Sequence, residues 1–217
     1  MHTKTVILFD LDGTLTDSVQ GITRSMTFAL EHFGVSVPDL TALNRFVGPP
    51  LATAFREMGV DEADIEAAMA KYRERFSAVG IFENAPYPGI HEALASLRNA
   101  GKTLAVATSK RWDYAVRIVA HFGLAEYFSF VGGSELDHTR TDKAEVMAYT
   151  LAQLGNPDPA TVCMVGDREH DIAGAQALGL PAIGVLWGYG SRAELEEAGA
   201  AALAANMDEL TRLLGVL

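Results

Sequence analysis

The segment from Val6 to Ser18 constrains the fold of this chain more than any other part of the sequence. It opens with four apolar residues, Val-Ile-Leu-Phe, which are typical of a buried β-strand. The strand ends at Asp10 and Asp12, and the chain then reaches Gly13. Side chains alternate along a strand, so both carboxylates point to the same side. The pair predicts a reaction centre; the weaker alternative is that one acid caps a turn and the other is solvated.

Strand and helix patterns alternate from about residue 89 to the C-terminus. Apolar, β-branched runs predict strands, and apolar residues at three-to-four spacing that end at glycine predict helices. We expect strands over 103–107, 128–131, 161–165 and 182–185, and helices over 90–100, 113–122, 142–154, 171–178 and 207–214. Such alternation is typical of an α/β protein with a parallel sheet, covered on both faces and joined by right-handed crossovers.

The segment 18–86 has a different pattern, with helical periodicity and no convincing strand. Apolar side chains recur at helical spacing in two stretches, one containing Ile22 and Met26 and the other Ile65, Met69 and Tyr72. We therefore expect a helical insertion that packs over the C-terminal edge of the sheet. The predicted domains are 1–16 with 87–217 for the α/β part and 17–86 for the insertion.

Charge and cysteine content narrow the function classes. The formal net charge is −11, which argues against nucleic acid or an anionic membrane surface as a partner. One cysteine, Cys163, excludes an internal disulfide, fits a reducing compartment, and lies in a strand pattern typical of a buried thiol. The N-terminal apolar run is too short for a signal peptide, and the uncharged segment 172–191 is broken by glycine and proline. We expect a cytoplasmic protein without a membrane span.

Polar residues follow three of the predicted strands. The first strand is followed by Asp10 and Asp12, the strand 103–107 by Thr108-Ser109-Lys110, and the strand 161–165 by the segment 166–171, which contains Asp167 and Asp171. Open α/β sheets bind ligands beyond the carboxyl ends of their strands. If these strands are neighbours, their polar ends meet in one crevice.

A metal ion would resolve the repulsion among these acids. Two carboxylates ~4 Å apart repel by roughly 4 kcal/mol at an effective dielectric near 20. An all-oxygen ligand set with few carboxylates favours Mg²⁺ shared with a substrate phosphate. His170, flanked by Glu169 and Asp171, is expected at the surface or behind the ligands.

Other polar residues suit a phosphate group. Thr108 and Ser109, expected where a strand passes into a helix, could bind phosphate through hydroxyls and N–H groups, or simply cap the helix. Lys143 at a predicted helix start opposes the helix dipole, so binding an anion or neutralising carboxylates gives it a reason to be there. Lys110 and Arg111 could serve in the same way, but we expect them to be solvated charges.

Together these residues resemble the motifs of the haloacid dehalogenase-like hydrolase superfamily, specifically its phosphatases with a small helical cap. The first motif is similar to Asp10-Leu11-Asp12-Gly13-Thr14, the second to Thr108, the third to Lys143, and the fourth to Gly166-Asp167 through Asp171. The segments Gly48-Pro49-Pro50-Leu51 and Trp187-Gly188-Tyr189-Gly190 are similar to members of the phosphoglycolate phosphatase and bacterial 5′-nucleotidase subgroup.

The resemblance implies a doubly wound core, a mobile cap and Mg²⁺. It implies that Asp10 is the nucleophile and Asp12 the general acid and base. It assigns the metal to Asp10, the Asp12 backbone carbonyl, Asp167 and Asp171. It assigns substrate binding to Gly13, Thr108, Ser109 and Lys143. Of these, Thr108 and Lys143 would also act in catalysis, by neutralising phosphoryl oxygens during transfer. The implied reaction is hydrolysis of a small phosphomonoester through an aspartyl-phosphate, with phosphoglycolate as the first candidate substrate.

Several alternatives stay open at this point. The substrate could be a nucleoside monophosphate, or the enzyme could be a β-phosphoglucomutase-type phosphosugar mutase, which would keep both aspartates. A non-catalytic binding protein on the same fold is disfavoured by the intact acids. Four cap side chains could recognise a carboxylate or a base, and each is also explained as a solvated helix residue: Arg24, Arg45, Tyr72 and Arg73. Phe46 or Tyr87 could supply an aromatic slot for a nucleotide. The chain is expected to be a monomer or a homodimer.

Overall fold

The computed structural model describes residues 4–37, 39–48, 51–135, 140 and 142–216. Pro49, Pro50 and Thr141 lie outside the described residues. The chain divides into two compact units, Met1–Thr16 with Pro86–Leu217, and Asp17–Ala85. Each is described separately below.

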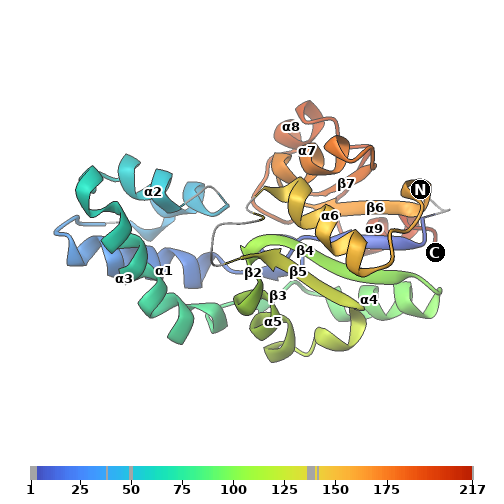
Figure 1. The fold of residues 1–217 in the computed structure, drawn as a ribbon, viewed down its shortest axis with the longest axis horizontal. Helices are drawn as coiled ribbons and strands as arrows, with labels where there is room; N and C mark the ends of the chain where they lie inside the picture. The colour runs from blue at the N-terminus through green and yellow to red at the C-terminus, as the bar shows by residue number, and fades with distance from the viewer. Residues whose placement is uncertain (1–3, 38, 49–50, 136–139, 141, 217) are drawn as a thin grey trace. The chain divides into compact units, whose positions relative to one another are not determined.

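The first unit contains a six-stranded sheet (Figure 1). Its strands are β5 (Phe130–Ser134), β4 (Thr103–Arg111), β1 (Val6–Phe9), β6 (Val162–Gly166), β7 (Ala182–Val185) and β8 (Ala202–Ala204), in that spatial order. Every neighbouring pair is parallel. The order runs outward from β1 in both directions, so the predicted doubly wound parallel sheet is confirmed.

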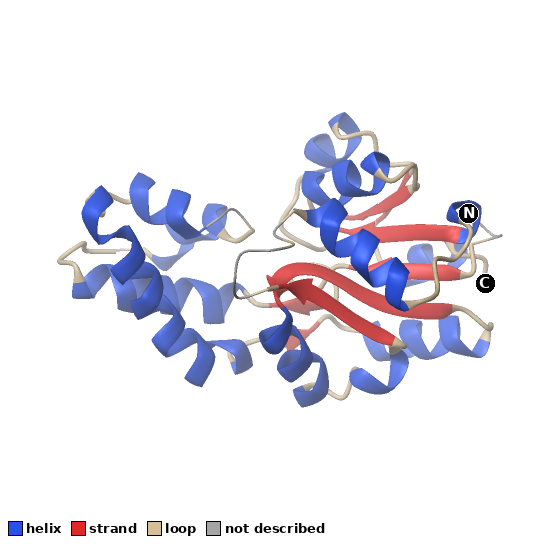
Figure 2. Ribbon diagram, in the orientation of Figure 1, coloured by secondary structure: helices blue, strands red, loops and turns tan. Residues whose placement is uncertain are grey.

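Helices cover both faces of this sheet, as the helices and strands of Figure 2 show. After β1 the chain passes outward through α4 (Ile90–Asn99) and α5 (Trp112–His121), and α9 (Met207–Leu213) packs on α4. On the return, α6 (Lys143–Gln153) packs on β4 and β5, and α7 (Glu169–Ala177) on β6 and β7. Right-handed crossovers place these two groups of helices on opposite faces.

The central strand is fully buried. Ile7, Leu8 and Phe9 have no exposed surface, as expected of a parallel strand covered on both faces. Cys163 on β6 is buried too, and burial raises the pKa of its thiol to about 12. The prediction of a buried structural thiol is confirmed.

Two features of this unit differ from the sequence prediction. The strand expected over 103–107 continues to Arg111, because β4 keeps pairing with β5 across an irregularity between Ala107 and Arg111. A strand, β8, and a helix, α8 (Arg192–Glu197), were not predicted. β8 reads Ala-Leu-Ala, which lacks the β-branched residues that mark strands, so its pairing with β7 is a tertiary effect.

The second unit is helical, as its periodicity predicts. Its helices are α1 (Val19–His32), α2 (Leu51–Glu57) and α3 (Ile65–Ala78), with 3₁₀ turns η1 (Leu40–Phe46), η2 (Glu62–Asp64) and η3 (Gly80–Phe82). Tyr72 is buried and stacks on Phe76, with ring centroids 5.2 Å apart. Arg24 and Arg75 both form ion pairs with Glu83. Tyr72 and Arg24 therefore have structural partners within this unit.

Where the chain passes between the units, the short strands β2 (Thr16–Asp17) and β3 (Ala85–Pro86) pair with each other.

Within the part of the chain that the structure describes, no helix has the length and apolar character needed to cross a membrane.

Candidate active site

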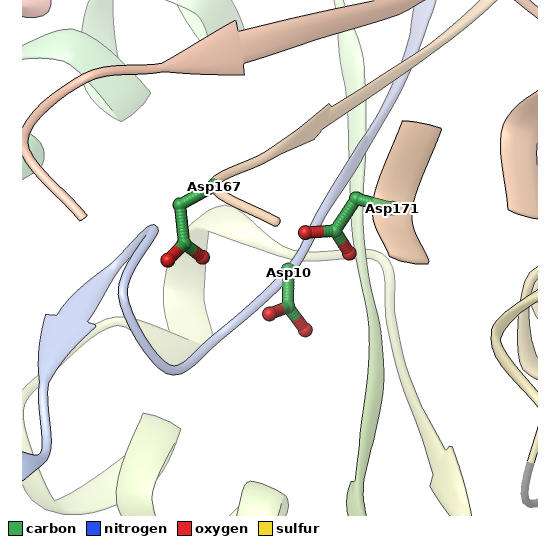
Figure 3. Close-up of side chains that lie close together, drawn as sticks. All are labelled: Asp10, Asp167 and Asp171. Carbon is green, nitrogen blue, oxygen red and sulfur yellow. The ribbon is translucent and has the colours of Figure 1, made fainter. Parts of the chain in front are cut away.

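Three carboxylates gather at the carboxyl edge of the sheet (Figure 3). Asp10 follows β1, Asp167 follows β6, and Asp171 lies in the first turn of α7. One oxygen from each lies within 4.8 Å of the other two. Adjacent pairing of β1 with β6 produces this proximity, and the Asp10 N–H donates to the Val165 carbonyl at 2.9 Å, which continues the ladder to the acid.

Lys143 joins two of these acids. Its Nζ lies 2.7 Å from Asp10 Oδ1 and 2.8 Å from Asp171 Oδ1. It also donates to the Ala107 carbonyl of β4 at 3.3 Å. The lysine stands at the first residue of α6, after Asp142, whose side chain caps the helix by accepting from the Ala144 N–H. The ammonium is thus a buried counter-ion and not a surface charge.

Burial and charge shift the pKa values of these groups. Burial alone would lower the pKa of Lys143, but the charges of Asp10 and Asp171 outweigh it and raise that pKa. Burial, followed by the charges of Asp171 and Asp10, raises the pKa of Asp167 to about 8. Burial also raises the pKa of Asp171, against the opposing effect of Lys143. One ammonium therefore does not compensate three buried carboxylates.

Asp167 is held in place by its neighbours. Its Oδ1 accepts from the Thr14 hydroxyl at 3.1 Å, and its Oδ2 from the Tyr189 N–H at 2.8 Å. A Cβ at Gly13 would lie 2.2 Å from Asp167 Oδ2, and one at Gly188 would lie 2.3 Å from Asp167 Cβ. These two glycines are required because the loops after β1 and β7 close directly on this acid.

Asp12 lies on the loop that follows Asp10, and its carboxylate pairs with a lysine that was expected to be solvated. Lys110 Nζ lies 2.8 Å from Asp12 Oδ2, and the lysine side chain is only 8% exposed. The expectation that Lys110 is a solvated charge is therefore wrong, because the extended β4 carries it into the site instead of releasing it into a helix. The neighbouring Arg111 pairs with Asp113 and stacks on Tyr114, and it is partly buried.

The structure places the remaining candidates as follows. Thr108 is buried, and its hydroxyl accepts from the Lys110 N–H at 3.2 Å. Ser109 is exposed, and His170 is exposed as expected. Thr108 and Ser109 lie within β4, whereas α5 begins at Trp112, so the expectation of a helix N-terminus at these two residues is wrong.

The acids fit a divalent cation of the hard, oxygen-binding kind. Three buried carboxylates converge, burial and charge raise the pKa of Asp167 to about 8, and the Lys143 ammonium offsets only part of their charge. The set offers oxygen and no thiolate or imidazole, which suits Mg²⁺.

Sequence reasoning missed four residues that shape this site. Thr14 and Tyr189 orient Asp167, Trp187 donates its indole N–H to the Thr14 carbonyl at 3.1 Å, and Lys110 binds Asp12. Thr14, Trp187 and Tyr189 lie inside segments that resemble family motifs, which was the available signal. Nothing in the local pattern around Lys110 distinguishes it from a surface lysine.

A model of haloacid dehalogenase-like hydrolases matches residues 7–185, which include all the acids described above. The chain belongs to this family. The chain is also similar to curated proteins that carry different names.

A protein named 5′-nucleotidase from Pseudomonas aeruginosa is 48% identical over 191 residues, covering 87% of this chain and 86% of the relative. Tyrosine-protein kinase PtkA from Mycobacterium tuberculosis is 44% identical over 213 residues, covering 97% of this chain and 72% of PtkA. A phosphoglycolate phosphatase from Agrobacterium fabrum is 34% identical over 188 residues, covering 84% of this chain and 80% of the relative.

The fold is shared with solved structures of this family. A predicted phosphatase from Clostridium acetobutylicum superposes with a TM-score of 0.91 at 45% identity, covering 99% of both chains. The sequence-based identification of a haloacid dehalogenase-like phosphatase, a phosphoric monoester hydrolase, is confirmed.

Proposed function

We propose that this hydrolase removes phosphate from small phosphomonoesters in a Mg²⁺-dependent reaction that passes through an aspartyl-phosphate on Asp10. The observation that carries the proposal is the cluster of Asp10, Asp167 and Asp171 around Lys143 at the carboxyl edge of the sheet. Buried acids of this kind are poor structural elements and good reaction centres.

In the first step a carboxylate oxygen of Asp10 attacks phosphorus, and the bond from phosphorus to the ester oxygen breaks. Asp12 gives its proton to the departing alkoxide. In the second step Asp12 takes a proton from water, the hydroxide attacks phosphorus, and the bond to Asp10 breaks with release of phosphate. Division into two displacements makes each one easier.

The other residues hold these groups and balance charge. Lys143 neutralises Asp10 before attack and faces the phosphoryl oxygens as charge develops on them. Thr108, buried within β4, offers a hydroxyl to the same oxygens. Asp10, Asp167, Asp171 and the Asp12 carbonyl would hold Mg²⁺, which supplies positive charge to the transferred phosphoryl group.

Nucleoside 5′-monophosphates are the first substrates to test, since the relative named 5′-nucleotidase is 48% identical. 2-Phosphoglycolate follows, on the 34% identical phosphoglycolate phosphatase and on the motif resemblance. We assign selection between them to the helical unit Asp17–Ala85, as the cap of such enzymes.

The relative named tyrosine-protein kinase PtkA supports a second candidate, in which the phosphoryl group passes to an acceptor other than water. Acceptors to test are a tyrosine side chain and, for the mutase alternative, a sugar hydroxyl. The aspartyl-phosphate is common to both candidates, so only the product distinguishes them.

The test is a substrate panel with the purified full chain and Mg²⁺. It contains nucleoside monophosphates, 2-phosphoglycolate, sugar phosphates and phosphotyrosine, and each product is identified. We expect free phosphate from at least one ester, with loss of turnover in EDTA and recovery on adding Mg²⁺. Folded protein that releases no phosphate from any ester would overturn the hydrolase proposal, and an isomerised sugar phosphate would replace it with the mutase.

A further inference from the structure

Lys110 is a partly buried lysine, with a side chain that is 8% exposed, and none of the roles above uses it. It lies near the end of β4, where the Thr108 hydroxyl accepts its N–H at 3.2 Å. Its Nζ lies 2.8 Å from Asp12 Oδ2. Ordering a lysine side chain and removing its ammonium from water both cost free energy. We therefore expect the contact between Lys110 and Asp12 to have a functional role.

The Asp12 carboxylate is held through one of its two oxygens. Within the described part of the chain, Oδ1 is buried and has no hydrogen-bond partner, whereas Oδ2 meets Lys110. The backbone around Asp12 is fixed separately, since Asp12 bridges to Thr16 and the Gly13 N–H donates to the Thr16 carbonyl at 2.8 Å. Lys110 therefore restrains the rotation of a carboxylate whose backbone is already set.

Each of the two proposed catalytic acids contacts a different lysine. Lys143 contacts Asp10 and Asp171 from the start of α6, and Lys110 contacts Asp12 from the end of β4. The first lies against the nucleophile and the second against the acid that exchanges protons.

We propose that Lys110 is a positioning residue that holds the Asp12 carboxylate in the orientation needed to protonate the leaving group. The inference rests on the proposed function, in which Asp12 is the general acid. It predicts a defect that depends on the leaving group. An alkoxide needs a proton as it departs, whereas p-nitrophenolate leaves without one.

The experiment compares K110M and K110R with the wild type on two esters, p-nitrophenyl phosphate and the best alkyl phosphate from the panel. The value of kcat/KM reports the phosphoryl transfer to Asp10, before water enters. We expect K110M to lower kcat/KM for the alkyl ester at least about tenfold more than for the aryl ester. K110R, which keeps a cation at this place, should recover part of the loss.

R111M is the matched control, because Arg111 is the next residue, is also partly buried, and pairs with Asp113. R111M should change kcat/KM only slightly, and by the same factor for both esters. With an active wild type, two results overturn the inference. One is an equal fall in kcat/KM for both esters in K110M and K110R, and the other is no fall in kcat/KM in either variant. A wild type that hydrolyses neither ester overturns the proposed function and this inference with it.

Discussion

The Nζ of Lys143 lies 2.7 Å from Oδ1 of Asp10, although 133 residues separate them in the chain. Asp10 directly follows the central strand β1, and Lys143 is the first residue of α6, which packs on β4 and β5. The parallel sheet brings them together because β4, β1 and β6 end at one edge. The same ammonium lies 2.8 Å from Asp171 Oδ1. Lys143 therefore links the proposed nucleophile to a second acid of the cluster.

Replacing Lys143 by methionine should damage both stability and activity. Removing one partner of a buried ion pair leaves uncompensated charge and costs about 3–5 kcal/mol. K143M should therefore melt at a clearly lower temperature than the wild type in EDTA, and its turnover should fall steeply. K102M is the control, since Lys102 donates to the Lys4 carbonyl away from these acids. Equal melting temperatures for K143M and K102M would contradict the assigned counter-ion role.

Replacing the nucleophile tests the covalent step. D10N keeps the shape of the side chain and removes its nucleophilic charge, so turnover should fall by about 10³-fold or more. Acid quenching during turnover should trap phosphate on the wild-type chain and none on D10N. Labelled D10N recovered with covalent phosphate would assign the intermediate to another residue.

Asp12 should be separable from Asp10 by metal binding. D12A removes the side chain of the acid and base but keeps the backbone carbonyl proposed as a metal ligand. We expect turnover of an alkyl phosphate to fall about 10²–10⁴-fold. The affinity for Mg²⁺, measured by titration calorimetry, should stay within about threefold of the wild type. D12A that retains full turnover would refute the acid and base assignment.

The raised pKa of Asp167 predicts a stability that falls with rising pH in the absence of metal. The folded chain keeps this proton up to about pH 8, whereas an unfolded Asp releases it near pH ~3.9. Between these values the folded state binds more protons, so the free energy of unfolding decreases as pH rises, by up to ~1.4 kcal/mol per pH unit. Asp171, with its pKa also raised, acts in the same direction.

Thermal melting from pH 5 to 8 in EDTA measures this effect. Mg²⁺ binds the deprotonated acids, so the stabilisation it gives should grow with pH. D167N has no proton to lose at this position, and its melting temperature in EDTA should depend less on pH. An unchanged pH dependence in D167N would place the titrating group elsewhere.

The local sequence pattern was sufficient to predict most of the helices and strands of this fold. The buried run before Asp10 and the glycines that end the helices indicate the α/β alternation, and the three polar strand ends indicate where a site forms. β8 escapes prediction because Ala202–Ala204 has no strand propensity and forms only by pairing with β7. Pairing also extends β4 past Thr108, which places Ser109 and Lys110 on a strand.

Lys110 shows why the rest of the site could not be predicted. A lysine after a strand is usually solvated, and nothing nearby in the sequence marks this one as different. Its burial depends on Asp12, which lies on another strand's loop, and on the exact end of β4. Contacts such as Tyr189 to Asp167 depend likewise on loop geometry that no local periodicity encodes.

Substitution of Gly13 and of Gly155 by alanine, compared as a matched pair, tests how closely the loop after β1 packs on Asp167. Both have left-handed backbones, with φ of +85° and +83°. A Cβ at Gly13 would lie 2.2 Å from Asp167 Oδ2, whereas one at Gly155 would meet nothing within 4 Å. G155A should therefore lose only about 1–2 kcal/mol of stability through backbone strain. G13A should lose more, because its methyl group must displace Asp167, and it should also bind Mg²⁺ more weakly in a calorimetric titration. Equal stability losses with unchanged Mg²⁺ affinity in both variants would show that Asp167 is not held as described.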